Sequence, residues 1–225
     1  AITGLLVHGC YLGGVYNAVK GGMPSGIISL IVGLQPLVTS AVAILVLKEK
    51  VSVRQWAGLV LGLAGVCLVL LEKFGGGESQ GSFPAWTLLW AALSLAGISL
   101  GTVYQKRSGT GADLVSGTLI QYAAAATLFA IGAFAFETRE VEWALPLILS
   151  MGWLVFGVSI GAILLLMWLI RRGAASQVAS LFYLVPPVTA LEAFILFDER
   201  LGLLAMVGGF ISIVGVALVV MRPAY

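Results

Sequence analysis

Long apolar runs separated by short polar breaks make up most of the chain. The runs predict eight membrane spans, at about residues 2–19, 25–47, 54–71, 85–105, 114–136, 144–170, 175–197 and 202–221. Glycine, proline and charged residues mark the breaks, as at Lys48-Glu49-Lys50. A bilayer offers backbone groups no hydrogen-bond partners, and the runs are too long and too uniformly apolar for barrel strands. The predicted fold class is therefore an all-α integral membrane protein.

The chain also repeats itself after a shift of 150 residues. Five polar or special residues recur in one ungapped register: Pro36 and Pro186, Thr39 and Thr189, Glu49 and Glu199, Gly58 and Gly208, and Gly65 and Gly215. Spans one to three therefore correspond to spans six to eight. Because a span and its copy are five spans apart, an odd number, equivalent helices must cross the membrane in opposite directions. Such inverted repeats are the architecture of many secondary transporters.

The longest polar break divides the chain into two unequal parts. It covers roughly residues 72–84 and is rich in glycine and serine, which is typical of a linker. We expect residues 1–73 to hold three helices of a first repeat, 74–84 to link the halves, and 85–222 to hold five helices of a second repeat. Spans four and five have no upstream copies, so the repeat predicts ten spans in the full protein, two of them before residue 1.

Composition and charge exclude some functions and orient the bundle. Of the residues, 60% are hydrophobic and 10% charged, against about 25% charged in soluble domains, which excludes a separate soluble catalytic or nucleic-acid-binding domain. Alternate loops place these cationic residues on one side: Lys48, Lys50, Arg54, Lys106, Arg107, Arg171, Arg172 and Arg222. The other side holds about half as many. By the positive-inside rule the richer side, with the C-terminus, faces the cytoplasm of a cell membrane.

One signature occurs in both repeats. Leu34-Gln35-Pro36-Leu37 is followed by Glu49 and by a helix with Gly58, Gly62 and Gly65; Leu184-Val185-Pro186-Pro187 is followed by Glu199, Gly208 and Gly215. This pattern resembles the EamA type of the drug/metabolite transporter superfamily. The resemblance implies ten helices in two inverted halves, with spans one to eight as family helices three to ten. It also implies export of amino acids, metabolites or drug-like compounds.

Two prolines indicate where a substrate cavity would lie. Pro36 and Pro186 fall near the middle of equivalent spans, where a proline removes a backbone hydrogen bond and kinks the helix. Transporters with inverted repeats bind substrate at this depth. The candidate cavity residues are Tyr11, Asn17, Gln35, Pro36, Thr39, Trp90, Ser94, Trp153, Tyr183, Pro186 and Thr189. The alternative is that the prolines, and the small-residue stripes on spans four and six, serve only helix packing. The glycines of spans three and eight are expected to be packing seams.

Glu192 is the only acidic side chain well inside a predicted span. A charge at that depth is costly, so Glu192 must face protein or water. It is either a proton or cation coupling site or a structural residue that reaches the outer interface. No lysine or arginine lies deep in a span, which favours neutral, zwitterionic or cationic solutes over multiply anionic ones. The sequence predicts no cofactor, metal or nucleic-acid partner, and it specifies no oligomeric state.

Two other functions remain as alternatives. A membrane sensor or assembly protein on the same scaffold would move no solute. An intramembrane hydrolase is suggested by Gly157-Val158-Ser159-Ile160-Gly161, which matches the G-x-S-x-G nucleophile motif. That motif requires a sharp turn between a strand and a helix, whereas this match lies inside an apolar span with only His8 as a possible base. We therefore predict that the protein is not an enzyme.

Overall fold

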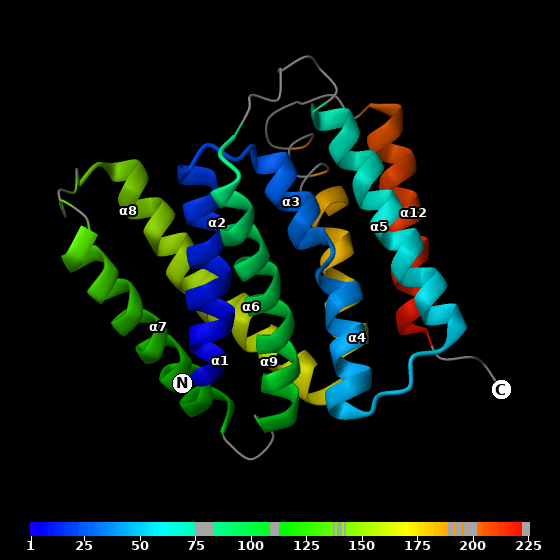
Figure 1. The fold of residues 1–225 in the computed structure, drawn as a ribbon, viewed down its shortest axis with the longest axis horizontal. Coiled ribbons are helices and arrows are strands. Elements are labelled where there is room, and N and C mark those ends of the chain that lie inside the picture. Colours follow the sequence, from blue (N-terminus) through cyan, green and yellow to red (C-terminus); the bar gives the residue numbers. More distant parts are fainter. Residues whose placement is uncertain are drawn as a thin grey trace.

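A computed structural model of the chain describes residues 1–74, 83–108, 113–136, 138, 141, 143–188, 191, 195 and 202–221. The regular elements among them are helical: α1 (Ile2–Gly4), η1 (Leu5–Cys10), α2 (Tyr11–Lys20), α3 (Ser25–Gly33), α4 (Gln35–Leu47), α5 (Val53–Phe74), α6 (Trp86–Ser108), α7 (Leu114–Phe136), α8 (Leu145–Gly152), η2 (Trp153–Ala162), α9 (Ile163–Arg172), α10 (Ala175–Ser180), η3 (Leu181–Leu184) and α12 (Leu203–Val220). Figure 1 shows them as a bundle of tilted rods.

The helices confirm the predicted membrane architecture. Six helical segments are long and apolar enough to cross a membrane, and 175–188 forms a shorter apolar helix. Equivalent helices of the two repeats begin 150 residues apart. Helices α3 and α10 start at residues 25 and 175, and α5 and α12 start at residues 53 and 203. Length and hydropathy fix these boundaries because a helix that spans a bilayer of about 30 Å needs about 20 apolar residues.

Both proline-containing spans are broken just before their prolines. Leu34 separates α3 from α4, and its N–H donates to the carbonyl of Ile31 at 3.1 Å, a tight 3₁₀-type turn. In the second repeat, the 3₁₀ segment η3 ends at Leu184, two residues before Pro186. The Ser40 hydroxyl donates to the carbonyl of Pro36 at 2.7 Å. The predicted kinks are therefore local interruptions of the α-helical hydrogen-bond pattern within otherwise helical spans, because proline cannot donate the backbone bond that would continue the turn.

A glycine seam joins α5 to α12, which run in opposite directions (Figure 1). A Cβ atom on Gly65 would lie 2.5 Å from the carbonyl oxygen of Gly208, and one on Gly58 would lie 2.6 Å from that of Gly215. The 150-residue shift converts each of these contacts into the other. Their symmetry confirms the inverted repeat and the predicted packing role of these glycines, which let two backbones approach closely.

Polar contacts pin both ends of the seam. At one end, the Glu72 carboxylate accepts the N–H of Ala205 in the first turn of α12. At the other end, the Arg54 guanidinium donates to the carbonyl of Met221, just past the end of α12. Both contacts satisfy backbone groups that a helix terminus leaves without intrahelical partners.

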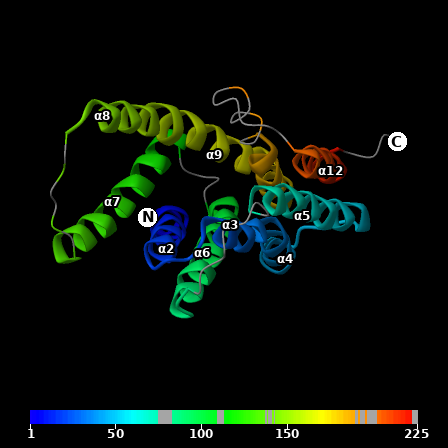
Figure 2. The ribbon, with the colours of Figure 1, turned by 90° about the horizontal axis from the view of Figure 1, so that it is seen from above.

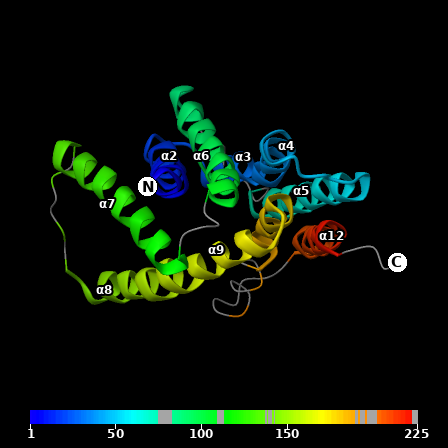
Figure 3. The same cartoon turned by 90° about the horizontal axis from the view of Figure 1, so that it is seen from below.

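The remaining helices form a second packed group. Gly97 and Gly101 of α6 press on η1, where Cβ atoms would lie 2.7 Å from the Cβ of Cys10 and 2.5 Å from a methyl of Val7. The predicted small-residue stripe on this span is thus a packing surface. Figures 2 and 3 place α5 and α12 at one end of the molecule and α7 and α8 at the other, with α2, α6 and α4 between them.

Candidate substrate cavity

Six buried polar atoms in the helical bundle have no hydrogen-bond partner among the described residues. They are Nε2 of His8 and Gln35, Oγ1 of Thr39, Oγ of Ser94 and Ser99, and the hydroxyl of Tyr183. Leaving such a group unpaired costs about 1–3 kcal/mol, and buried polar groups in native proteins are nearly always paired with protein or water. Unpaired groups gathered in a membrane bundle indicate places where water or a polar solute binds.

Gln35 and Thr39 form the clearest pair of such groups. Gln35 begins α4 directly after the break at Leu34 and is 1% exposed, and Thr39 is fully buried one turn later. Residues four apart lie on the same face of a helix. The break at Pro36 therefore brings two unpaired polar side chains and an interrupted backbone to one place. The role of Gln35 and Thr39 in a substrate cavity stays a prediction.

Tyr183 approaches from the second repeat but packs on α5. It lies in η3, is buried, and presses its ring on Gly62, where a Cβ atom would lie 2.4 Å from a ring carbon. Leu59, Leu63 and Leu184 surround it. Gly33 occupies the equivalent position in the first repeat, so the halves differ here.

Tyr11, Trp90 and Ser94 lie in the seam between α2 and α6. A Cβ atom on Gly14 would lie 2.6 Å from the carbonyl oxygen of Trp90 and 2.9 Å from the Cβ of Ser94. The backbone N of Tyr11 lies against Gly97 in the same seam. Asn17 donates to the carbonyl of Gly13 at 2.8 Å, one turn back in its own helix. Their seam positions fit the packing alternative, and their roles as cavity residues stay predictions.

The other candidates lie apart from this group. Trp153, at the start of η2, is 71% exposed on the outside of the long α8–η2–α9 rod. Pro186 follows η3 and is half-buried. Thr189 and Glu192 lie outside the described residues. Among the residues that are described, no group of three or more His, Cys, Asp and Glu side chains comes together to hold a metal.

A histidine–tyrosine stack links two π-helical segments. His8 in η1 stacks on Tyr122 of α7 with ring centroids 4.8 Å apart, and the Tyr122 hydroxyl donates to the Ser159 carbonyl in η2 at 2.6 Å. Ser159 lies within continuous helix, not at a strand-to-helix turn, as we expected. Isolated π-helical turns occur often at functional sites. Sequence reasoning missed Tyr122 because no motif pairs it with His8.

Glu49 makes a contact between the repeats that sequence reasoning also missed. Its carboxylate accepts the Ala175 N–H at 2.9 Å and the Ser176 hydroxyl at 3.2 Å, at the start of α10. Lys48 has φ of 55° and ends α4 in a left-handed turn, and the Glu49 N–H returns to the Ala43 carbonyl at 3.3 Å. This turn aims the carboxylate at α10. The recurrence of Glu49 as Glu199 was the available signal, but it did not reveal a partner.

The chain was then compared with known proteins. It is 31% identical over 208 residues to "Uncharacterized transporter YvbV" of Bacillus subtilis, covering 88% of this chain and 63% of that protein. It is 28% identical over 221 residues to "Probable amino-acid metabolite efflux pump" of Escherichia coli, covering 94% and 73%. A crystal structure that is 19% identical matches with a TM-score of 0.80 over 96% of this chain and 74% of the other, which supports the fold.

A third relative is "Probable terminal-alkyne amino-acid exporter" of Streptantibioticus cattleyicolor, which is 28% identical over 88% of this chain. The chain spans less than two thirds of the length of the Bacillus protein and of this exporter. The model of the EamA-like transporter family matches residues 1–71 and 85–221, two segments on either side of the predicted linker. This match agrees with the helices that break before prolines and pack through glycines, and it shows that the chain belongs to the EamA-like transporter family.

Proposed function

We propose that the full-length protein is a secondary exporter of small neutral, zwitterionic or cationic solutes such as amino acids. The observation that carries the proposal is the pair of buried, unpaired side chains of Gln35 and Thr39 beside the break in α3–α4. An amide and a hydroxyl suit the polar groups of an uncharged or zwitterionic solute. Two relatives whose names refer to amino-acid efflux or export support this solute class.

The contact of Glu49 supports alternating access as the mechanism. It ties α4 of the first repeat to α10 of the second at the end of the bundle where α4, α6 and α9 end (Figure 1). These helix ends carry Lys48, Lys106 and Arg171. The 150-residue shift maps Glu49 onto Glu199, and residues 175 and 176 onto residues 25 and 26. We therefore infer that the described contact closes one side, and that its repeat-related counterpart closes the opposite side when the first contact opens.

We further propose that Glu192 couples transport to a proton or cation. The support comes from sequence: Glu192 is the sole acidic residue deep in a predicted span, and it shares a helix face with Thr189. A carboxyl group there would be protonated from one side and would release the proton to the other as the bundle changes state. Glutamine at this position keeps the shape of the side chain but fixes it as neutral.

Uptake of radiolabelled amino acids into inverted vesicles containing the full-length protein tests both proposals. We expect the parent protein to accumulate solute when a pH gradient is imposed, and Glu192→Gln to exchange solute downhill without concentrating it. If Glu192→Gln concentrates solute as well as the parent, Glu192 is structural. If no solute moves and none raises the melting temperature, a sensor or assembly protein on this scaffold is the better interpretation.

We propose that the end of the bundle with Lys48, Lys106 and Arg171 faces the cytoplasm, and with it the C-terminus. In a protein whose Cys10 and Cys67 are replaced by alanine, Thr138→Cys is expected to react with an impermeant thiol reagent in intact cells, and Arg172→Cys is not. Both residues are exposed: Thr138 follows α7, and Arg172 is the last residue of α9. Helices α7 and α9 end on opposite sides of the bundle (Figure 1). The reverse labelling would invert the orientation.

The division into repeats is also a proposal. Residues 1–73 and 85–222 form the two unequal repeats in this interpretation, and 74–84 link them. The family match to 1–71 and 85–221 supports these boundaries.

A further inference from the structure

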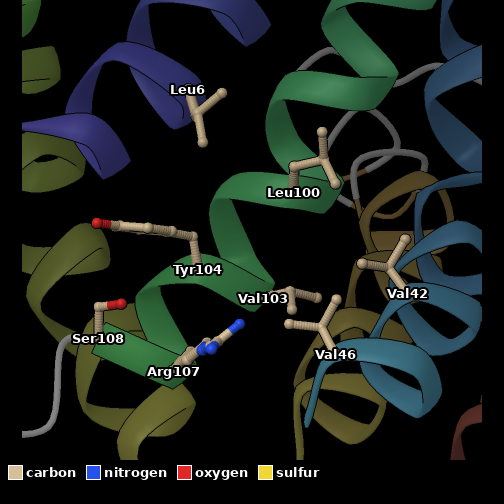
Figure 4. A pocket seen from close by; sticks show the side chains of 8 residues that line it. All are labelled: Leu6, Val42, Val46, Leu100, Val103, Tyr104, Arg107 and Ser108. Carbon is tan, nitrogen blue, oxygen red and sulfur yellow. The ribbon is translucent and has the colours of Figure 1, made fainter.

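A pocket of about 430 Å³ lies on α6, between η1 and α4 (Figure 4). Its upper part is aliphatic and includes Leu6, Val42 and Leu100, while Tyr104, Arg107 and Ser108 line the part nearest the end of α6, with Val46 of α4 beside Arg107 (Figure 4). None of the predicted cavity residues lines it. The pocket is therefore a feature separate from the proposed substrate site.

The pocket opens at the surface of the bundle. Val46 is 41% exposed and Leu100 is 45% exposed, which is typical of positions that face hydrocarbon in a membrane protein. From Leu100 to Arg107 the pocket follows α6 for about 10 Å at 1.5 Å per residue. Along the membrane normal, the pocket wall is apolar first and polar at its end. One leaflet of a bilayer has the same order, with acyl chains inside and headgroups at the surface.

Arg107 supplies positive charge at the polar end. It lies in the last turn of α6, and it makes no hydrogen bond or ion pair with the residues that the structure describes. Figure 4 shows its side chain extending toward Val46 of α4. Two neighbouring cations are already engaged, since Lys106 Nζ donates to the Arg171 carbonyl at 3.1 Å and Arg172 lies 4.4 Å from the centre of the Trp168 ring. The Arg107 guanidinium therefore has donors to offer to a ligand.

We propose that this pocket binds an anionic phospholipid of the cytoplasmic leaflet. One acyl chain lies along Leu6, Val42 and Leu100, and the phosphate accepts hydrogen bonds from Arg107. Guanidinium groups bind phosphate oxygens through two parallel hydrogen bonds, and anionic lipids are concentrated in the leaflet that faces the cytoplasm. The leaflet assignment rests on the orientation proposed above, whereas the lipid class rests on the pocket itself.

The test measures how lipids stabilise the delipidated full-length protein in detergent. We expect phosphatidylglycerol to raise the melting temperature more than phosphatidylcholine does. Arg107→Gln removes the group that binds the phosphate. It should therefore raise the phosphatidylglycerol concentration required for the same stabilisation about tenfold. Arg172→Gln is the matched control, since it removes a cation from the same end of the bundle but outside the pocket, and it should retain the preference for phosphatidylglycerol.

A second variant tests the acyl-chain part of the proposal. Val42→Trp fills the aliphatic wall away from Arg107 and should reduce stabilisation by both lipids. Three outcomes would overturn the proposal: an undiminished phosphatidylglycerol preference in Arg107→Gln, an equal loss in Arg172→Gln, or stabilisation by glycerol phosphate equal to that by the whole lipid. Because binding in detergent needs no membrane orientation, a failure of the orientation proposal would appear only in the cysteine labelling.

Discussion

Replacing Gln35 by leucine is expected to reduce solute transport by about 5- to 30-fold while the protein stays folded. Gln35 is 1% exposed, and its Nε2 has no partner among the described residues. Leucine has a similar volume and removes a buried polar group that the protein itself does not satisfy, so the free energy of unfolding should stay the same or rise. The loss of transport follows because a solute bound at the break in α3–α4 loses one or two hydrogen bonds, each typically worth about 1 kcal/mol.

Gln121→Leu provides the matched control for this experiment. Gln121 is also a buried glutamine in a helix, but its Nε2 donates to Oε1 of Gln105 at 3.3 Å. Its replacement leaves Gln105 without that donor and should lower the melting temperature without a selective effect on uptake. Uptake and melting temperature are measured on the same purified variants. If Gln35→Leu lowers the melting temperature as much as Gln121→Leu does, or transports normally, Gln35 is a packing residue.

The sequence predicted the features that depend on local chemistry. Span boundaries followed from hydropathy, because only an apolar helix can cross a bilayer. The packing role of Gly58, Gly65, Gly208 and Gly215 followed from their small size within apolar spans, whereas the pairing of α5 with α12 became known only from the structure. The breaks in α3–α4 and before Pro186 followed from the backbone bond that proline cannot make.

Features that depend on contacts between distant residues were not predictable in the same way. Glu49 and Ala175 are 126 residues apart, and no pattern in either segment specifies the other. Trp153 shows why candidate cavity residues were hard to select: an aromatic stripe on a helix can face lipid, protein or a cavity with the same periodicity. The stack of His8 on Tyr122 depends on the π-helical turn of η1, which has no hydrophobic period of its own.

Replacing Glu49 by glutamine is expected to open the contact between α4 and α10 and expose the residues beneath it. Ala43 is fully buried there against Val103 and Ala175, so it reports on this contact. Glutamine has one acceptor oxygen in place of two and carries no charge. The variant therefore loses one of the two bonds to Ala175 and Ser176, and the charge that strengthens the other. A loss of about 1–2 kcal/mol shifts a two-state equilibrium about 5- to 30-fold toward the open state.

The measurement is the reaction rate of Ala43→Cys with an impermeant thiol reagent applied from the proposed cytoplasmic side, in a full-length protein whose native Cys10 and Cys67 are replaced. Glu49→Gln should raise this rate about 5- to 30-fold, and Ser176→Ala should raise it less because the charged Glu49 carboxylate still accepts the Ala175 N–H. Glu72→Gln is the control, since Glu72 also caps a helix of the other repeat. Glu72 lies at the end of the seam between α5 and α12, which we expect to stay closed during transport. A larger rate in Glu72→Gln than in Glu49→Gln would mean that both carboxylates only hold the fold together. A rise confined to the Glu49 variant, reversed when solute is present on the opposite side, would identify the Glu49 contact as one that opens and closes as the two repeats exchange states.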